Sequence, residues 1–141
     1  MRASAQRLFA YGTLMFAPVM QAVCGDGPPE PPQPARLHGY RRYRVAGEVY
    51  PAIIAAAGAV VDGVLYGAIG RACWARLDAF ETEHYVRTQV TVDHAQDHTL
   101  TAWTYVLAPT QRSCLSDAAW SPEEFADRHL ATYLGGDLYT P

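Results

Sequence analysis

The sequence predicts a small α+β domain. Runs that favour strands outnumber segments that favour helices, and the two kinds of segment follow a mixed order without regular alternation. The chain has 141 residues, within the usual size of one domain, and half of them are hydrophobic. We therefore expect residues 1–141 to form a single domain that packing alone can stabilise.

The N-terminal segment is predicted to contain a strand, a turn and a helix. Residues 7–11 are mostly apolar and short, Gly12 marks a turn, and Pro18 is placed to begin a helix that continues to Val23. Five prolines then fall within residues 25–34, where they fix φ and remove N–H donors. This composition indicates an extended surface loop, with a ligand for SH3-type domains as the alternative.

The middle of the chain is typical of strands. Residues 35–69 contain short runs rich in tyrosine, valine and isoleucine that are separated by glycines, which indicates several strands. Within them, Asp62-Gly63 is the signal of a hairpin turn or a bulge. Apolar residues at spacings of three and four then predict a helix over residues 71–81.

The C-terminal part is predicted to contain a hairpin and a helix. Residues 86–92 and 100–107 are expected to pair as antiparallel strands across a polar turn. The helix has clear boundary signals: Ser121 as N-cap, Pro122 at the first helical position, a glutamate three residues after the cap, and Gly135 beyond the end.

The composition excludes several classes of function. Eleven basic and fourteen acidic residues give a net charge of -3, which argues against a nucleic-acid-binding surface. Every one of the eleven basic residues is arginine, so lysine Schiff-base chemistry and P-loop phosphate binding are excluded. The apolar region 52–69 is interrupted by Asp62, and the N-terminus shows no cleavage signal, so we expect a soluble, cytoplasmic protein without a membrane span.

The cysteines are predicted to be reduced thiols. Cys24, Cys73 and Cys114 are odd in number, far apart and without a CxxC pair, which fits neither a disulfide framework nor a zinc site. No neighbouring histidine supports activation of Cys114 as a nucleophile, so we expect it to be a small buried hydrophobic residue.

Glu81 is the candidate catalytic residue. It shares one face of the predicted helix with Trp74 and Leu77, because the three are separated by three and four residues. Burial on that apolar face would raise the carboxyl pKa and bring it into the range of a general base. The alternative is a helix-end glutamate that faces solvent or pairs with Arg87.

Two other patterns of acidic and histidine residues carry weaker hypotheses. Glu83 invites a paired-carboxylate site, but at two residues from Glu81 it would point in a different direction. His94 and His98 have a spacing that binds metals on helices, whereas their segment is predicted to be a solvated turn. No metal site is predicted.

The loop Tyr11-Gly12-Thr13-Leu14 is the candidate binding segment. Glycine lets a backbone approach a ligand closely, and successive N–H groups between a strand and a helix can hold a carboxylate or an oxyanion.

Several blocks of sequence, taken in order, resemble the gamma-glutamylcyclotransferase-like family, and within it the branch of gamma-glutamylamine cyclotransferases and avirulence-induced plant proteins. The blocks are FAYGTL at 9–14, LHGY at 37–40, VYPAI at 49–53, DGVLY at 62–66, LDAFE at 77–81 and YVR at 85–87. The resemblance extends over nearly the whole chain, including the closing helix.

The resemblance implies a small mixed β-barrel flanked by helices. It also implies that Tyr11, Gly12, Thr13 and Leu14 bind a small gamma-glutamyl substrate and that Glu81 is the general acid/base. The implied reaction is an intramolecular acyl transfer that releases 5-oxoproline from a gamma-glutamyl amine or amino acid, without any cofactor. A catalytically silent module that binds the same ligands is the alternative. The sequence identifies neither the leaving amine nor the oligomeric state.

Overall fold

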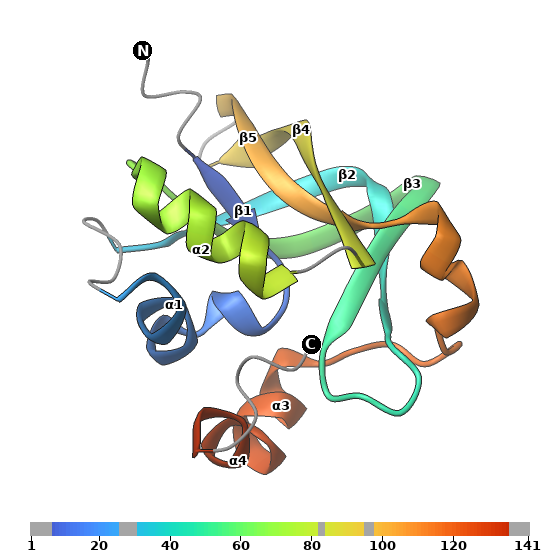
Figure 1. Ribbon diagram of the computed structural model, residues 1–141. Coiled ribbons are helices and arrows are strands. Elements are labelled where there is room, and N and C mark those ends of the chain that lie inside the picture. Colours follow the sequence, from blue (N-terminus) through green and yellow to red (C-terminus); the bar gives the residue numbers. More distant parts are fainter. Residues whose placement is uncertain (1–6, 26–30, 82–83, 95–97, 136–141) are drawn as a thin grey trace.

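The computed structural model describes residues 7–25, 31–81, 84–94 and 98–135, and its strands form a closed barrel in the order β1-β3-β2-β4-β5 (Figure 1). The strands are β1 (Leu8–Ala10), β2 (Gln33–Arg44), β3 (Pro51–Tyr66), β4 (Tyr85–His94) and β5 (His98–Leu107). The barrel is mixed, because β1 runs parallel to β5 while the other pairs are antiparallel. The predicted α+β class and helix-flanked mixed barrel are confirmed.

Four α-helices and two short 3₁₀ helices are found in the described part of the chain. They are η2 (Thr13–Met15), α1 (Ala17–Cys24), α2 (Arg71–Glu81), η4 (Pro109–Cys114), α3 (Pro122–Arg128) and α4 (Leu130–Gly135). Figure 1 shows α1 and α2 side by side against the barrel, with α3 and α4 beyond α1. None of these helices has both the length and the apolar character that crossing a membrane requires.

The segment predicted to hold several short strands is instead dominated by two long ones, β2 and β3, and the expected turn or bulge at Asp62-Gly63 is wrong. Both residues lie inside β3, paired with β2. Gly63 is needed for close packing, because an added Cβ would meet the Ala10 carbonyl oxygen and lie 2.7 Å from Cζ of Phe9. The irregularity in the pairing falls at Gly39, where φ is 87°.

The helix predicted over residues 71–81 is confirmed with the same bounds, and the predicted first strand, first helix and hairpin are confirmed with different ends. The hairpin of β4 and β5 is longer than predicted and pairs from Tyr85 and Leu107 to His94 and His98. Of the proline-rich segment 25–34, Gln33 and Pro34 belong to β2, and residues 26–30 lie outside the described part of the chain.

The N-cap of the last helix is confirmed by the Ser121 hydroxyl oxygen, which accepts a hydrogen bond from the Glu124 N–H at 3.2 Å. The helix does not continue unbroken toward Gly135, however. It ends at Arg128, and α4 follows after His129.

The prediction of reduced cysteines is wrong for two of the three. A disulfide joins Cys24, at the end of α1, to Cys73 in the first turn of α2, with their Cα atoms 4.9 Å apart. Arg76 adds a second link between these helices by donating a hydrogen bond of 2.6 Å to the Cys24 carbonyl. The packing of α1 against α2 brings together two cysteines that are 49 residues apart in sequence. Cys114 is free, as predicted, but it is exposed at the end of η4 and not buried.

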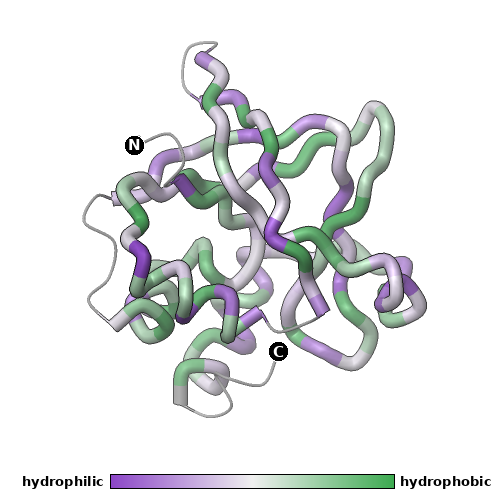
Figure 2. Tube along the Cα trace, turned by 45° about the horizontal axis from the view of Figure 1, so that its top comes forward, coloured by the Kyte–Doolittle hydropathy of each residue, from purple (hydrophilic) through white to green (hydrophobic). Residues whose placement is uncertain are grey.

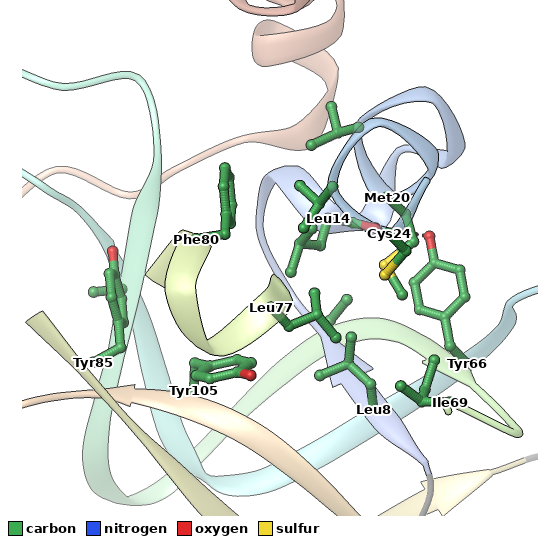
Figure 3. Close-up of a cluster of buried hydrophobic side chains, with 14 of the residues drawn as sticks. Leu8, Leu14, Met20, Cys24, Tyr66, Ile69, Leu77, Phe80, Tyr85 and Tyr105 are labelled. Carbon is green, nitrogen blue, oxygen red and sulfur yellow. Dashed lines mark hydrogen bonds between the residues drawn. The ribbon is translucent and has the colours of Figure 1, made fainter. Parts of the chain in front are cut away.

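The hydrophobic core has two parts, one inside the barrel and one between the barrel and the helices. Figure 3 shows the second part, where Leu77 of α2 lies near Leu8 of β1, with Leu14 and Met20 on the side of η2 and α1. Along the trace in Figure 2, polar and apolar segments alternate at short intervals, as expected of elements that bury one face. This core fixes the end of β1 against α2, and the candidate site lies at that junction.

Candidate active site

A cavity of about 40 Å³ lies where the end of β1 and the following loop meet the C-terminal end of α2. Its walls combine backbone of the first strand and loop, one carboxylate and several tyrosine rings. They are formed by Leu8, Phe9, Ala10, Tyr11, Gly12, Thr13, Leu14, Tyr50, Pro51, Phe80, Glu81, Tyr85, Tyr105 and Tyr133. The structure thus brings the candidate binding loop and the candidate catalytic glutamate, which are far apart in sequence, to one cavity.

The first half of the loop is fixed by hydrogen bonds and close packing. The Tyr11 hydroxyl is buried and donates to the Tyr105 carbonyl at 2.6 Å, while Arg42 donates to the Tyr11 carbonyl at 2.7 Å. Gly12 passes so close to Pro51 that a Cβ would lie 2.9 Å from the proline Cγ. Gly12 therefore permits an approach that a larger residue would block.

The second half of the loop is the short helix η2, with Gly12 as its N-cap. The Leu14 carbonyl accepts a hydrogen bond from the buried Tyr66 hydroxyl at 2.7 Å, and the Thr13 hydroxyl lies 3.5 Å from the Tyr133 hydroxyl. At the start of a helix, the N–H groups have no partner within the helix. Thr13 and Leu14 are the first residues of η2, and both line the cavity.

Glu81 is the last residue of α2 and is partly buried. It shares a helix face with the buried side chains of Trp74 and Leu77, as the spacing predicts. Burial, reinforced by the negative charge of Asp78, raises the pKa of Glu81 to about 8. The carboxyl group is thus poised to gain or lose a proton near neutral pH.

Arg87 lies outside the cavity and holds Asp78 in place. Its Nε is 3.2 Å from Oδ1 of Asp78, and its guanidinium lies over the rings of Trp74 and Trp103, at 4.7 and 5.3 Å from their centroids. The same Asp78 oxygen accepts a hydrogen bond of 2.6 Å from the Tyr105 hydroxyl. The sequence analysis offered a pair between Arg87 and Glu81 as an alternative. In the structure, Arg87 forms its ion pair with Asp78.

Four tyrosines of the cavity wall, Tyr50, Tyr85, Tyr105 and Tyr133, were not among the site residues predicted from the sequence. Burial raises the pKa of Tyr50 to about 12 and raises the pKa values of Tyr85, Tyr105 and Tyr133 from their usual value as well. All four therefore remain neutral hydroxyl groups near pH 7. Their one sequence signal is the abundance of tyrosine, nine in the chain, which does not say which of them meet.

The other sequence candidates do not join this cavity. His94 and His98 are paired at the end of the β4–β5 hairpin, where His94 forms a hydrogen bond with Gln33. Within the described ranges, no group of three or more metal-ligating side chains is found. Glu83 lies outside the described residues.

The chain matches a protein-family model described as "Gamma-glutamyl cyclotransferase, AIG2-like" over residues 8–122. It is 33% identical to AIG2-like protein D of Arabidopsis thaliana over 130 residues, which span 90% of this chain and 83% of that protein.

Solved structures show the same fold. The solution structure of an Arabidopsis thaliana protein is similar with a TM-score of 0.71 and 24% identity, over 96% of this chain and 82% of that one. A gamma-glutamyl cyclotransferase is similar with a TM-score of 0.60 and 19% identity, over 72% of this chain and 66% of that one.

Proposed function

The chain belongs to the gamma-glutamyl cyclotransferase, AIG2-like family, and on that premise we propose that it releases 5-oxoproline from a gamma-glutamyl amine or gamma-glutamyl amino acid. One observation carries the proposal: a carboxyl group with a pKa of about 8 shares a small cavity with the loop Tyr11–Leu14. The two parts supply a proton acceptor and a cluster of backbone donors.

The proposed reaction is an internal acyl transfer. The α-amino nitrogen of the substrate attacks its own gamma-carbonyl carbon, which forms the C–N bond of a five-membered lactam. The original amide C–N bond then breaks, and the leaving nitrogen takes a proton and departs as an amine or amino acid. The reaction consumes no water, and it neither takes up nor releases a net proton.

Glu81 is the proposed proton carrier. Its carboxylate form takes a proton from the attacking amino group, because an ammonium nitrogen has no lone pair for attack. The resulting carboxyl group then protonates the leaving nitrogen. With a pKa of about 8, roughly one Glu81 in ten is ionised at pH 7, so both forms are accessible in one catalytic cycle.

The loop is proposed to stabilise the negative charge that develops on the carbonyl oxygen. The N–H groups of Thr13 and Leu14 lie at the start of η2, and Gly12 allows the backbone to approach the substrate. One such donor contributes about 2.7 to 4 kcal/mol in a comparable oxyanion hole. Because nucleophile and electrophile belong to one molecule, the remaining task is to hold the substrate in a folded, near-attack conformation.

The test compares wild-type protein with Glu81→Gln on a panel of gamma-glutamyl amines and gamma-glutamyl amino acids, with 5-oxoproline release as the readout. We expect kcat/KM of the variant to fall by about 10²- to 10⁴-fold, because glutamine keeps the size of the side chain but cannot exchange the proton. The control is Glu124→Gln, which changes an exposed carboxylate on α3. Full activity of Glu81→Gln would refute the assignment of the base, and ligand binding without product in the wild type would favour the silent binding module.

A further inference from the structure

A second cavity, of about 180 Å³, adjoins the first and shares two of its walls, Tyr50 and Tyr85. Its remaining polar lining comes from Glu48, before β3, and from Gln111 and Cys114 of η4, with His84 also present. No candidate residue from the sequence and no part of the mechanism above uses this space.

The first cavity is too small to hold a whole substrate. Its volume of about 40 Å³ leaves room for about three water molecules, at 10 to 15 Å³ each. A gamma-glutamyl amide whose carbonyl lies beside Glu81 must therefore extend beyond this cavity. The larger cavity beyond Tyr50 and Tyr85 offers the space into which the leaving part can extend.

The two shared walls are one tyrosine held by a hydrogen bond and one tyrosine whose pKa responds to charges in both cavities. The Tyr85 hydroxyl donates to the Pro51 carbonyl at 3.0 Å, which fixes this ring. Burial raises the pKa of Tyr50, and the charges of Glu48, in the second cavity, and of Glu81, in the first, both add to the rise. Tyr50 thus lies within electrostatic reach of a carboxyl group in each cavity.

The charge of the second cavity has one sign. Glu48 contributes a carboxylate, and no arginine is found among the described residues that line the cavity. The nearby Arg44 donates through Nε to the backbone carbonyl of Glu48 at 2.8 Å. The chain contains no lysine that could supply a compensating charge. A carboxylate on the leaving group would be repelled by Glu48, whereas an ammonium group would be attracted.

We propose that the second cavity is the leaving-group subsite, and that Glu48 selects leaving amines that carry a second, positively charged group over those that carry a carboxylate. This inference rests on the proposed function, since it defines which part of a gamma-glutamyl substrate occupies the space. It assigns Glu48 to substrate selection and Glu81 to chemistry.

The first test uses three gamma-glutamyl conjugates whose leaving groups each contain four carbons: 1,4-diaminobutane, butylamine and 4-aminobutanoate. At pH 8, where histidine side chains ordinarily carry no charge, wild-type kcat/KM is expected to follow the order cationic, neutral, anionic, with at least a tenfold difference between the extremes. In Glu48→Gln the extremes are expected to come within about threefold of each other. Glu124→Gln, on the exposed surface of α3, is expected to keep the wild-type order.

The second test needs no turnover. Cys114 is the free cysteine of the described chain and lines the second cavity, so a bound leaving group should shield its thiol from iodoacetamide. We expect the diaminobutane conjugate to slow alkylation of Cys114 at least threefold in Glu81→Gln, and to lose this effect when Glu48→Gln is added.

Two results would overturn the inference: an unchanged preference in Glu48→Gln, or turnover of the conjugates without any protection of Cys114. If the wild type turns over none of the three, the proposed reaction fails for these amides, and protection of Cys114 alone decides whether the cavity binds them. Absence of both turnover and protection rejects the subsite as well.

Discussion

Replacement of Glu81 by glutamine should change the pH dependence of stability, apart from any effect on activity. The pKa of Glu81 is 4.5 in an unperturbed chain and about 8 in the folded protein, where burial and the charge of Asp78 disfavour the carboxylate. Below pH 4.5 the side chain is protonated in both states and contributes no pH dependence. Between pH 4.5 and 8 the unfolded state has released the proton while the folded state retains it, so stability falls as the pH rises.

The size of this effect follows from the interval between the two pKa values. At 1.36 kcal/mol per pH unit, the interval from 4.5 to about 8 corresponds to a loss of at most about 5 kcal/mol in the free energy of unfolding. Glutamine does not titrate. The stability of Glu81→Gln relative to wild type should therefore rise across this range and stay constant above pH 8.

The assay is urea denaturation of both proteins at pH 5, 6, 7, 8 and 9, followed by tryptophan fluorescence. All other titrating groups remain in both proteins, so they largely cancel in the difference, and Glu124→Gln serves as an exposed carboxylate control. Parallel pH profiles for wild type and Glu81→Gln, within about 1 kcal/mol, would refute the claim that Glu81 holds its proton in the folded protein.

Three further predictions concern its neighbour, the disulfide and the barrel. Asp78→Asn removes the negative charge that adds to the high pKa of Glu81, so the acid limb of the kcat/KM profile for 5-oxoproline release should move to lower pH; an unmoved limb would contradict this. Reduction of the disulfide between Cys24 and Cys73 should lower the free energy of unfolding by about 2 to 4 kcal/mol. Thiol titration in denaturant should detect one thiol before reduction and three thiols after it. Detection of three thiols before reduction would show that the disulfide is absent. Gly63→Ala should destabilise the protein by at least about 2 kcal/mol in the same denaturation assay, because its Cβ would meet the backbone of β1, and a neutral effect would disprove that contact.

Elements whose signals lie within a few residues were predictable. The spacing of Trp74, Leu77 and Glu81 identifies both the helix and its buried face, because residues three and four apart meet on one side of any α-helix. Ser121 caps its helix through a local hydrogen bond. The loop Tyr11–Leu14 and Glu81 were candidates both from their local patterns and from the resemblance to a family, and the structure brings both to one cavity.

Features that depend on distant contacts were not predictable. Asp62-Gly63 has the composition of a turn, yet β1 lies against Gly63 and the strand continues through it, since tertiary packing overrides local preference. The pairing of Cys24 with Cys73 depends on how α1 packs against α2, which cysteine spacing does not encode.

The sequence by itself determined the α+β class, the helix that carries Glu81, the hairpin of β4 and β5, and the absence of lysine chemistry, because these depend on composition and short-range spacing. The tertiary structure decided which tyrosines surround Glu81, and that Glu48 and Tyr50 face a second cavity next to the first. The physical reason is that proton affinity and cavity shape are set by burial and by charges brought together from distant segments, and these exist only once the barrel has closed.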